Sequence, residues 1–177
     1  MLLLGIGKDE VKLVPHHKEW ANLFKEEKKL LHSIIGEQTL GIEHFGSTAI
    51  KDIHAKPVID IVVGVRTLGD VDRFDKKRLI IEADYYHLPR VQIDGKVVFA
   101  KFSDVKNLIR THYLHIVEYE GDWWNKHLLF RDRLNADLTL RKEYETLKLT
   151  IAEEHSDDAK AYTDAKEAFI EKVLKGD

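Results

Sequence analysis

Residues that could carry out chemistry gather between Gly41 and Val65, in the segment GIEHFGSTAIKDIHAKPVIDIVVGV. Two apolar stretches with the character of strands flank a turn of small residues that begins at Gly46. Asp60 lies inside the second apolar stretch. A carboxylate in a buried strand needs a partner or a bound cation, because burying an unpaired charge is costly. We therefore expect a functional site in this segment.

The turn and the carboxylate together predict a phosphate ligand held near a metal ion. A turn that opens with Gly46 and Ser47 after a strand exposes backbone N–H groups, which favour phosphate. The hydroxyl group of Ser47 adds a donor, and Thr48 belongs to the same turn. Asp60, on the next expected strand, could hold Mg²⁺ against the phosphates of a nucleotide. The alternative is an ordinary turn in which Ser47 caps a short helix, because such short motifs are weakly specific.

Side chains on the neighbouring strands could complete a metal site around Asp60. Alternation places His112 and His115 on opposite faces of their strand, so only one of them can join Asp60 unless the strand bulges. Glu43 or His44 could supply a further ligand. The divalent metals that such a set would hold are Mg, Mn or Zn, and histidine ligands favour Zn, Mn or Ni over Mg. The alternative is that these histidines only satisfy hydrogen bonds near the end of the sheet.

Two basic residues beside the expected strands are candidates for phosphate contacts. Arg110 can pair with phosphate oxygens through two parallel hydrogen bonds, whereas Lys56 would act as a point charge. Together with Gly46, Ser47 and Thr48, they form the set that we expect to bind the phosphates of a ligand.

Three features of the C-terminal part allow both a structural and a functional interpretation. Arg131 either forms an internal ion pair or reaches the same cleft. Trp123 and Trp124 point about 100° apart on a helix, so only one of them fits neatly into a core. Tyr162 and Lys166 share a helix face, and we expect them to anchor the tail of the chain rather than to act in chemistry.

Hydrophobic periodicity predicts the elements that position these residues. The dense Val and Ile run at 58–65 is typical of a strand covered on both faces. An Asp94-Gly95 pair between apolar alternations indicates a hairpin, Asp122 is an expected N-cap, and residues 46–52 form a turn or short helix. We expect strands at 10–15, 39–45, 58–65, 91–94, 96–103 and 110–117. We expect helices at 16–35, 68–83, 123–136, 140–155 and 158–175.

The composition is that of an ordinary globular protein, with 44% hydrophobic and 33% charged residues among 177 and a net charge of -3. It lacks the overall basic charge of a nucleic-acid binder, so we expect no nucleic-acid partner. The absence of cysteine excludes disulfides, thiolate nucleophiles and cysteine metal sites. No run approaches the roughly 18 apolar residues of a membrane span, and the apolar start has no basic region before it. We therefore expect a cytoplasmic protein that does not engage a membrane.

The chain shows a change of pattern near residue 120, but no linker. Residues 1–120 have mixed α/β character, and residues 121–177 are helical. We therefore expect one domain over 1–177. The oligomeric state stays open, with a homodimer among the alternatives.

Five motifs of this chain together resemble those of the GrpB family, an uncharacterised group assigned to the nucleotidyltransferase-like superfamily. They span nearly the whole chain and are IEHFGSTA (42–49), AKPVIDIVVGV (55–65), RTHYLH (110–115), HLLFRDRL (127–134) and YTDAKEAFI (162–170). The resemblance implies an α/β (α+β) fold of the nucleotidyltransferase type. Such a fold has a mixed sheet of about five strands, flanking helices and a C-terminal helical segment.

The superfamily signature is a strand, a Gly-Ser turn, about a dozen residues, and a strand that carries Asp. The resemblance therefore implies a nucleotide-binding protein that transfers a nucleotidyl group from a nucleoside triphosphate to an unknown acceptor. In that reaction, Asp60 would hold the metal ion. The phosphates would lie at Gly46 and Ser47, and Lys56 and Arg110 would neutralise their charge.

Two departures from the family pattern keep other functions open. The superfamily has a second carboxylate two residues after the first, where this chain has Val62. The GrpB pattern usually continues with Pro-Gly-Leu after the turn, where this chain has Lys51-Asp52-Ile53. The alternatives are a non-catalytic binder of a nucleotide or other phosphorylated small molecule, and an interaction module. Because similar domains occur fused to dephospho-CoA kinase, such a module would be linked to coenzyme A metabolism.

Overall fold

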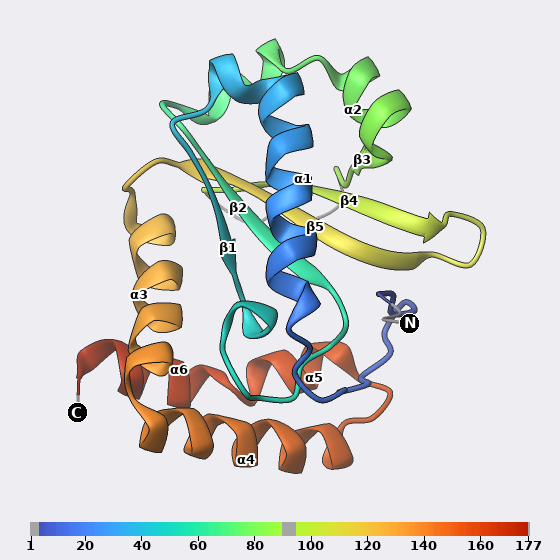
Figure 1. Cartoon of the computed structure of the whole chain (residues 1–177). Helices are drawn as coiled ribbons and strands as arrows, with labels where there is room; N and C mark the ends of the chain where they lie inside the picture. The colour runs from blue at the N-terminus through green and yellow to red at the C-terminus, as the bar shows by residue number, and fades with distance from the viewer. Residues whose placement is uncertain (1–3, 90–94, 177) are drawn as a thin grey trace.

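A mixed sheet of five strands forms the centre of this computed structural model, which describes residues 4–89 and 95–176 (Figure 1). The strand order is β1-β2-β5-β4-β3. β2 and β5 run parallel, and the other neighbouring pairs run antiparallel. The expected mixed sheet of about five strands is confirmed. The strands are β1 (Gly41–Phe45), β2 (Ile59–Val65), β3 (Tyr85–His87), β4 (Val97–Asp104) and β5 (Ile109–Glu118).

Helices cover both faces of the sheet and close the chain. Two helices pack on one face and a third packs on the other, and three C-terminal helices lie beside the connection between β1 and β2 (Figure 1). The two helices on the first face are α1 (Glu19–Ile35) and α2 (Lys76–Ala83), and the helix on the other face is α3 (Asp122–Ala136). The three C-terminal helices are α4 (Leu138–Glu154), α5 (Ala159–Asp164) and α6 (Glu167–Lys175). Short 3-10 helices are η1 (Gly36–Gln38), η2 (Ser47–Ala49) and η3 (Leu68–Arg73).

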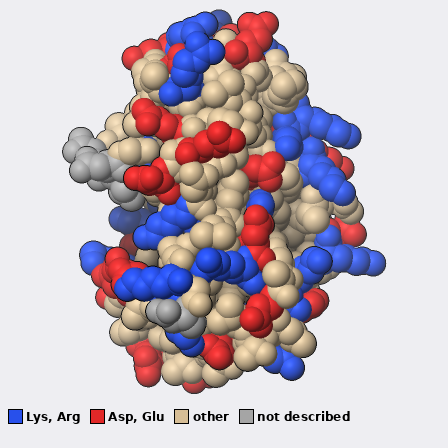
Figure 2. Space-filling model, turned by 90° about the vertical axis from the view of Figure 1, so that its left-hand side faces the viewer, with Lys and Arg blue, Asp and Glu red and all other residues tan. Residues whose placement is uncertain are grey.

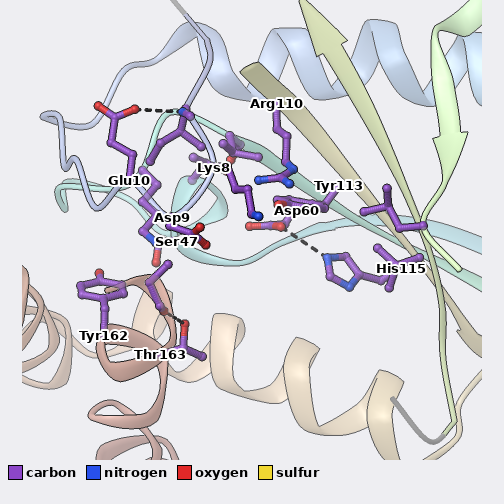
Figure 3. A pocket seen from close by; sticks show the side chains of 18 of the residues that line it. Lys8, Asp9, Glu10, Ser47, Asp60, Arg110, Tyr113, His115, Tyr162 and Thr163 are labelled. Carbon is purple, nitrogen blue, oxygen red and sulfur yellow. Dashed lines mark hydrogen bonds and ion pairs between the residues drawn. The ribbon is translucent and has the colours of Figure 1, made fainter. Parts of the chain in front are cut away.

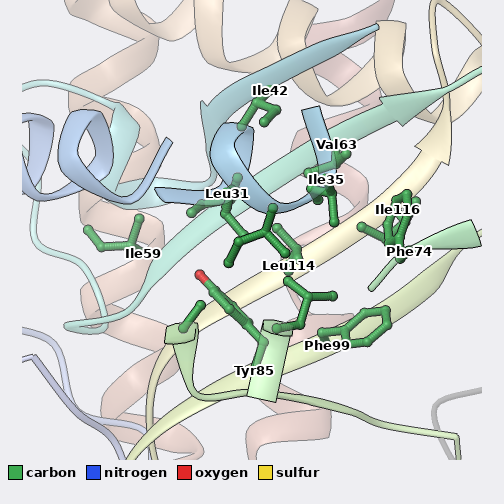
Figure 4. Packing of buried hydrophobic residues seen from close by; sticks show 14 of the residues in the cluster. Leu31, Ile35, Ile42, Ile59, Val63, Phe74, Tyr85, Phe99, Leu114 and Ile116 are labelled. Carbon is green, nitrogen blue, oxygen red and sulfur yellow. The ribbon is translucent and has the colours of Figure 1, made fainter. Parts of the chain in front are cut away.

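The main hydrophobic core lies between α1 and the sheet. It combines Leu31 and Ile35 of α1 with Val63, Leu114 and other apolar side chains of the strands (Figure 4). The opposite face of β2 packs Val62 against Trp124 of α3. β2 is therefore covered on both faces, as its continuous Val and Ile pattern predicts. Burial of each such side chain contributes about 1.5–3 kcal/mol.

The C-terminal helices are fixed by their own small cores. Ile50 and Ile53, from the connection between β1 and β2, pack against Leu134 and Tyr144. A further cluster joins Tyr162 of α5 to the N-terminal segment and to α4. The residues after 120 are therefore folded against the rest of the described chain, and they bring α5 next to the N-terminal segment.

Two expected helices are each divided in the structure. The helix expected at 68–83 is interrupted at Phe74, whose backbone is extended, and Asp75 then caps α2 by accepting a hydrogen bond from Arg78 N at 2.9 Å. The helix expected at 158–175 consists of α5 and α6, which meet at Ala165 and Lys166. In both places, the apolar pattern of the sequence continues through the break, so periodicity alone does not reveal that the helix is divided.

Three further expectations about the elements differ from the structure. Residues 10–15 form a single isolated bridge, between Val14 and Ala55, instead of a strand. The N-cap of α3 is Gly121 rather than Asp122. The sequence pattern missed β3, and the expected strand 91–94, with its Asp94 turn, lies outside the described residues.

Acidic and basic side chains are interspersed over the face shown in Figure 2. Among the helices of residues 4–89 and 95–176, none is both long enough and apolar enough to cross a membrane.

Candidate functional site

Asp60 lies on the face of β2 that points away from the main core. It sits between Phe45 of β1 and Tyr113 of β5 in the sheet. Its Oδ1 atom is 3.4 Å from Nε2 of His115, and its side chain is 30% exposed. Among the residues that the structure describes, His115 is the side chain that pairs with Asp60, and the carboxylate remains accessible.

Gly46 gives the Asp60 carboxylate its space. The backbone of Gly46 has a φ of 71°, and a Cβ atom there would approach Asp60 Oδ2 to 2.7 Å. Glycine is required at this position for both reasons, since it lacks a Cβ and tolerates positive φ. The physical link between the Gly-Ser turn and the carboxylate in the next strand is thus direct contact.

A cavity of about 520 Å³ lies over Asp60 (Figure 3). Five parts of the chain enclose it. They are the N-terminal segment, the connection between β1 and β2, the sheet, the two ends of the connection between β3 and β4, and α5 with the N-cap residue of α6. Arg110, Tyr113 and His115 surround Asp60 in Figure 3, and Tyr162 and Thr163 line the opposite wall. The polar residues that line the cavity are Lys8, Asp9, Glu10, Ser47, Thr48, Lys56, Asp60, Lys96, Arg110, Tyr113, His115, Tyr162, Thr163 and Lys166.

The lining of this cavity is more cationic than anionic. Five side chains carry positive charge, whereas Asp9, Glu10 and Asp60 carry negative charge. Across the described part of the chain, the ion pairs within 4.0 Å include none of the five. The cationic side chains are Lys8, Lys56, Lys96, Arg110 and Lys166.

Burial changes the protonation of three of these lysines. It lowers the pKa of Lys56 and of Lys96, and the negative charge of Asp60 opposes the change in both. Burial and the positive charge of Lys56 together lower the pKa of Lys166 to about 8, and the negative charge of Asp60 opposes them. An anion in the cavity would favour the protonated form of each amine.

Tyr162 brings two of the lysines together. The Nζ atoms of Lys56 and Lys166 lie 4.6 and 4.5 Å from the centre of the Tyr162 ring, which is 2% exposed. Cation–π attraction at such distances partly offsets the cost of burying the ammonium groups. Lys148 lies behind this arrangement, 1% exposed, and its Nζ donates to the backbone carbonyl of His54.

An aromatic stack supports the other end of the cavity. The His115 ring stacks on Trp123 at 5.6 Å between ring centres, and Trp123 stacks on His127 at 3.5 Å. Lys96 Nζ is 5.0 Å from the centre of the Trp123 ring. Trp124 is buried in the core of this face, whereas Trp123 lies within the stack. The two indoles thus take different roles, as their angular separation on a helix predicts.

The structure does not bring the other expected metal ligands to Asp60. His112 faces the main core, and its Nδ1 is 2.9 Å from the Thr111 hydroxyl oxygen. His44 also faces that side, where its Nε2 lies 2.9 Å from the Thr48 hydroxyl oxygen. Burial lowers the pKa of His44 to about 4 and that of His112 to about 3, so both are neutral.

Glu43 is held at the edge of the sheet by Arg131. Arg131 Nη1 donates to Glu43 Oε2 at 3.2 Å and to the His44 carbonyl at 2.7 Å, and its Nε donates to Asp132. Arg131 thus joins α3 to β1 and is absent from the lining of the cavity. Within residues 4–89 and 95–176, no group of three or more His, Asp or Glu side chains could hold a metal ion. Strand alternation turns His44 and His112 to the other face of the sheet. Glu43 shares the face of Asp60 but is paired with Arg131 and Lys28.

The structure brings several expected phosphate contacts together. Ser47, Thr48, Lys56 and Arg110 all line the cavity, and Gly46 lies against Asp60. Arg110 Nε is buried and has no hydrogen-bond partner among the described residues. A buried donor of this kind is normally satisfied, so a ligand or a water molecule is expected near it.

Sequence reasoning missed part of the cavity. Lys8, Asp9, Glu10 and Lys96 are not among the expected site residues, and Lys166 is expected only to anchor the tail. Tyr113 could have been found, because alternation places it on the same face as His115. Val62, which stands where the superfamily has its second carboxylate, is buried and apolar. The other two carboxylates of the cavity, Asp9 and Glu10, belong to the N-terminal segment.

The fold and site define an α+β protein with a mixed five-stranded sheet and a cationic cavity on one sheet face. Residues 10–176 match the family model described as GrpB protein, and the chain belongs to the GrpB family. It is 57% identical to the glutamate-rich protein GrpB of Alkalihalophilus pseudofirmus, over 97% of this chain and 98% of that protein.

A solved structure and a more distant relative extend this comparison. The crystal structure of the conserved protein GrpB from Enterococcus faecalis superposes with a TM-score of 0.78 at 31% identity, covering 93% of this chain and 96% of that chain. A dephospho-CoA kinase of Mycolicibacterium paratuberculosis is 27% identical over 93% of this chain, which corresponds to 45% of that protein. A GrpB-like region thus forms part of a longer protein that bears an enzyme's name.

Proposed function

We propose that this protein binds a small phosphorylated molecule, of the nucleotide class, in the cavity over Asp60. The observation that carries the proposal is the set of five cationic side chains without ion-pair partners in the described chain. Like charges that share one cavity repel one another, and an anion that contacts several of them offsets this repulsion. Arg110 can bind phosphate oxygens through two parallel hydrogen bonds, whereas lysines act as mobile point charges.

Other features of the cavity fit a ligand larger than a phosphate ion. Its volume of about 520 Å³ lies in the range typical of small-molecule sites. Tyr113, Val58 and Val98 supply apolar and aromatic surface beside the charged groups. Asp60 can accept hydrogen bonds from hydroxyl groups of a ligand. The match to a dephospho-CoA kinase supports the inclusion of dephospho-CoA among the molecules to be tested.

Nucleotidyl transfer is a second candidate, favoured by the position of Asp60 in the cavity and by the family resemblance. A divalent metal would need ligands beyond Asp60 and His115, and a nucleotide's phosphates can supply them, since Mg²⁺ commonly binds one or two carboxylates together with substrate phosphates. Binding of Mg²⁺ or Mn²⁺ would then require the nucleotide. An interaction module, in contrast, would bind no nucleotide.

Isothermal titration calorimetry with AMP, ATP, CTP and dephospho-CoA tests the proposal, with and without Mg²⁺. The Lys56→Met and Arg110→Met variants should weaken binding of the nucleotide at least tenfold, because each removes a cation from the cavity. Lys77→Met is the matched control, because Lys77 is exposed on α2, away from the cavity. Equal affinities in all four proteins, or no binding to wild type, would contradict the proposal.

The pH dependence of binding provides a second readout. Lys166 has a pKa of about 8, so it loses its charge as the pH rises through that value. AMP keeps a constant charge in this range, because the second pKa of a phosphate monoester is about 6. We therefore expect the affinity for AMP to fall between pH 7.5 and 9. An affinity independent of pH there would exclude Lys166 from the anion site.

A further inference from the structure

Lys166 occupies an unusual position for a lysine. It is the N-cap residue of α6, and its side chain lines the cavity. Its backbone N–H donates to Thr163 O at 3.2 Å, which fixes its backbone position against α5. The N-terminal end of a helix carries partial positive charge, which disfavours an ammonium group.

The groups that face Lys166 add to this effect. Lys56, from the connection between β1 and β2, shares the Tyr162 ring with it, and Lys148 approaches from α4. Asp60 of β2 is the carboxylate whose charge opposes their repulsion. The remaining charged or titratable groups around the cavity are Lys8, Asp9, Glu10, Lys96, Arg110, Tyr113 and His115.

These surroundings favour a neutral amine. Because its pKa is lowered to about 8, a larger fraction of Lys166 is unprotonated near neutral pH than of an ordinary lysine, whose pKa is 10.5. A desolvated lysine beside another cation is a recognised way to activate an amine nucleophile. Lys148 cannot act in the same way, because it does not line the cavity and its Nζ is engaged with the His54 carbonyl.

We infer that Lys166 is a nucleophilic amine that forms a reversible imine with an aldehyde or ketone group of a phosphorylated ligand. The inference rests on the proposed function, since the phosphate would be held by Lys56 and Arg110 while the carbonyl group reaches Lys166. The neutral Nζ attacks the carbonyl carbon to form a carbinolamine. A proton then moves from nitrogen to oxygen, and water leaves as the C=N bond forms. The step requires no oxidant or reductant, and Asp60 stabilises the imine when it is protonated.

Pyridoxal 5′-phosphate is a suitable probe, because it carries both a phosphate and an aldehyde. The native protein is incubated with a stoichiometric amount at pH 7.5, reduced with borohydride and digested for peptide mapping. We expect Lys166 to be the main modified residue, and an excess of AMP to suppress its modification at least fivefold. Modification distributed over exposed lysines, or centred on Lys56, would overturn the inference.

The Lys166→Arg variant tests the imine, and AMP binding by the wild-type protein tests the proposed function. Arginine cannot form the imine, so the variant should lose the pyridoxal adduct whatever its affinity for AMP. If wild type binds AMP but Lys166 stays unmodified, only the imine inference fails. If wild type does not bind AMP, the proposed function fails.

A measurement on the wild-type protein avoids dependence on any variant. Competitive acetylation with trace acetic anhydride reports the reactivity of each lysine as a function of pH. The reactivity of Lys166 should reach half its maximum near pH 8, and Lys56→Met should move this midpoint upward by removing the neighbouring charge. A wild-type midpoint near 10.5, the ordinary value for lysine, would overturn the inference.

Discussion

At the scale of single residues, the site depends on the contact between Gly46 and Asp60. A turn glycine and a strand carboxylate fourteen positions apart in the chain meet because β1 and β2 are antiparallel neighbours that pair Phe45 with Asp60. The sequence alone could assign these two residues to one site, because a turn of small residues precedes a strand that contains a single charged residue. It could not show that the carboxylate lies against the glycine, since that contact depends on the register of the two strands.

Replacement of Gly46 by alanine tests this contact. Gly46 lies at φ 71° and ψ −173°, a conformation that is essentially restricted to glycine and costs other residues about 1–3 kcal/mol. The new Cβ would also meet Asp60 Oδ2 at 2.7 Å. Gly95→Ala is a matched control, because Gly95 has a φ of +79° but a Cβ atom there would meet no described atom within 4 Å. Urea unfolding should therefore show a larger loss of stability for Gly46→Ala than for Gly95→Ala.

The double variant Gly46→Ala/Asp60→Ala completes the test. Removal of the carboxylate relieves the closest approach, so the two changes should cost less together than the sum of their separate effects. Strict additivity would show that Asp60 has no part in the requirement for glycine.

At the scale of elements, periodicity predicts the faces of strands better than the breaks in helices. Alternation correctly separates His112 from His115, because side chains of a strand point to opposite faces without exception in this part of β5. The breaks at Phe74 and Ala165 escape prediction, because capping and tertiary contacts divide helices whose apolar pattern continues. β3 escapes because a strand of three residues is too short to show a period.

The capping of α5 gives a prediction at this scale. Asp158 accepts hydrogen bonds from the backbone N–H groups of Lys160 and Ala161, at 3.1 and 2.9 Å. Asp158→Ala should cost about 1 kcal/mol of stability, and should weaken AMP binding several-fold, because α5 carries Tyr162 and a wall of the cavity.

Asp137→Ala provides the comparison for this prediction. Asp137 caps α4 through Thr139 N and Leu140 N, at 2.7 and 3.1 Å, and does not line the cavity. The Asp137→Ala variant should reduce the free energy of unfolding by about as much as Asp158→Ala and leave the affinity for AMP unchanged. Equal losses of affinity in both variants would mean that stability, not the position of α5, governs binding.

At the scale of the whole molecule, the net charge of -3 conceals a local excess of positive charge. The cavity draws its cations from Lys8 near one end of the chain, from Lys56, Lys96 and Arg110 in or beside the sheet, and from Lys166 near the other end. Motifs in the sequence locate this part of the site, because its residues fall within two short stretches of the chain, 47–60 and 110–115. The walls escape prediction, because only the packing of the C-terminal helices against the N-terminal segment brings them together.

This packing implies that one ligand should stabilise both ends of the chain at once. Val11 N donates to Ser156 O at 3.2 Å, and Ile6 pairs with Arg110 on the adjacent strand edge, so the two walls are joined by backbone hydrogen bonds. Hydrogen exchange measured with and without saturating AMP should show increased protection at residues 6–11 and 159–166 together. The helix α2 should show no local change, because it lies on the other face of the sheet. Protection limited to β2 and β5 would show that the ligand contacts the sheet without engaging the walls, and the cavity would then not be the binding site as a whole.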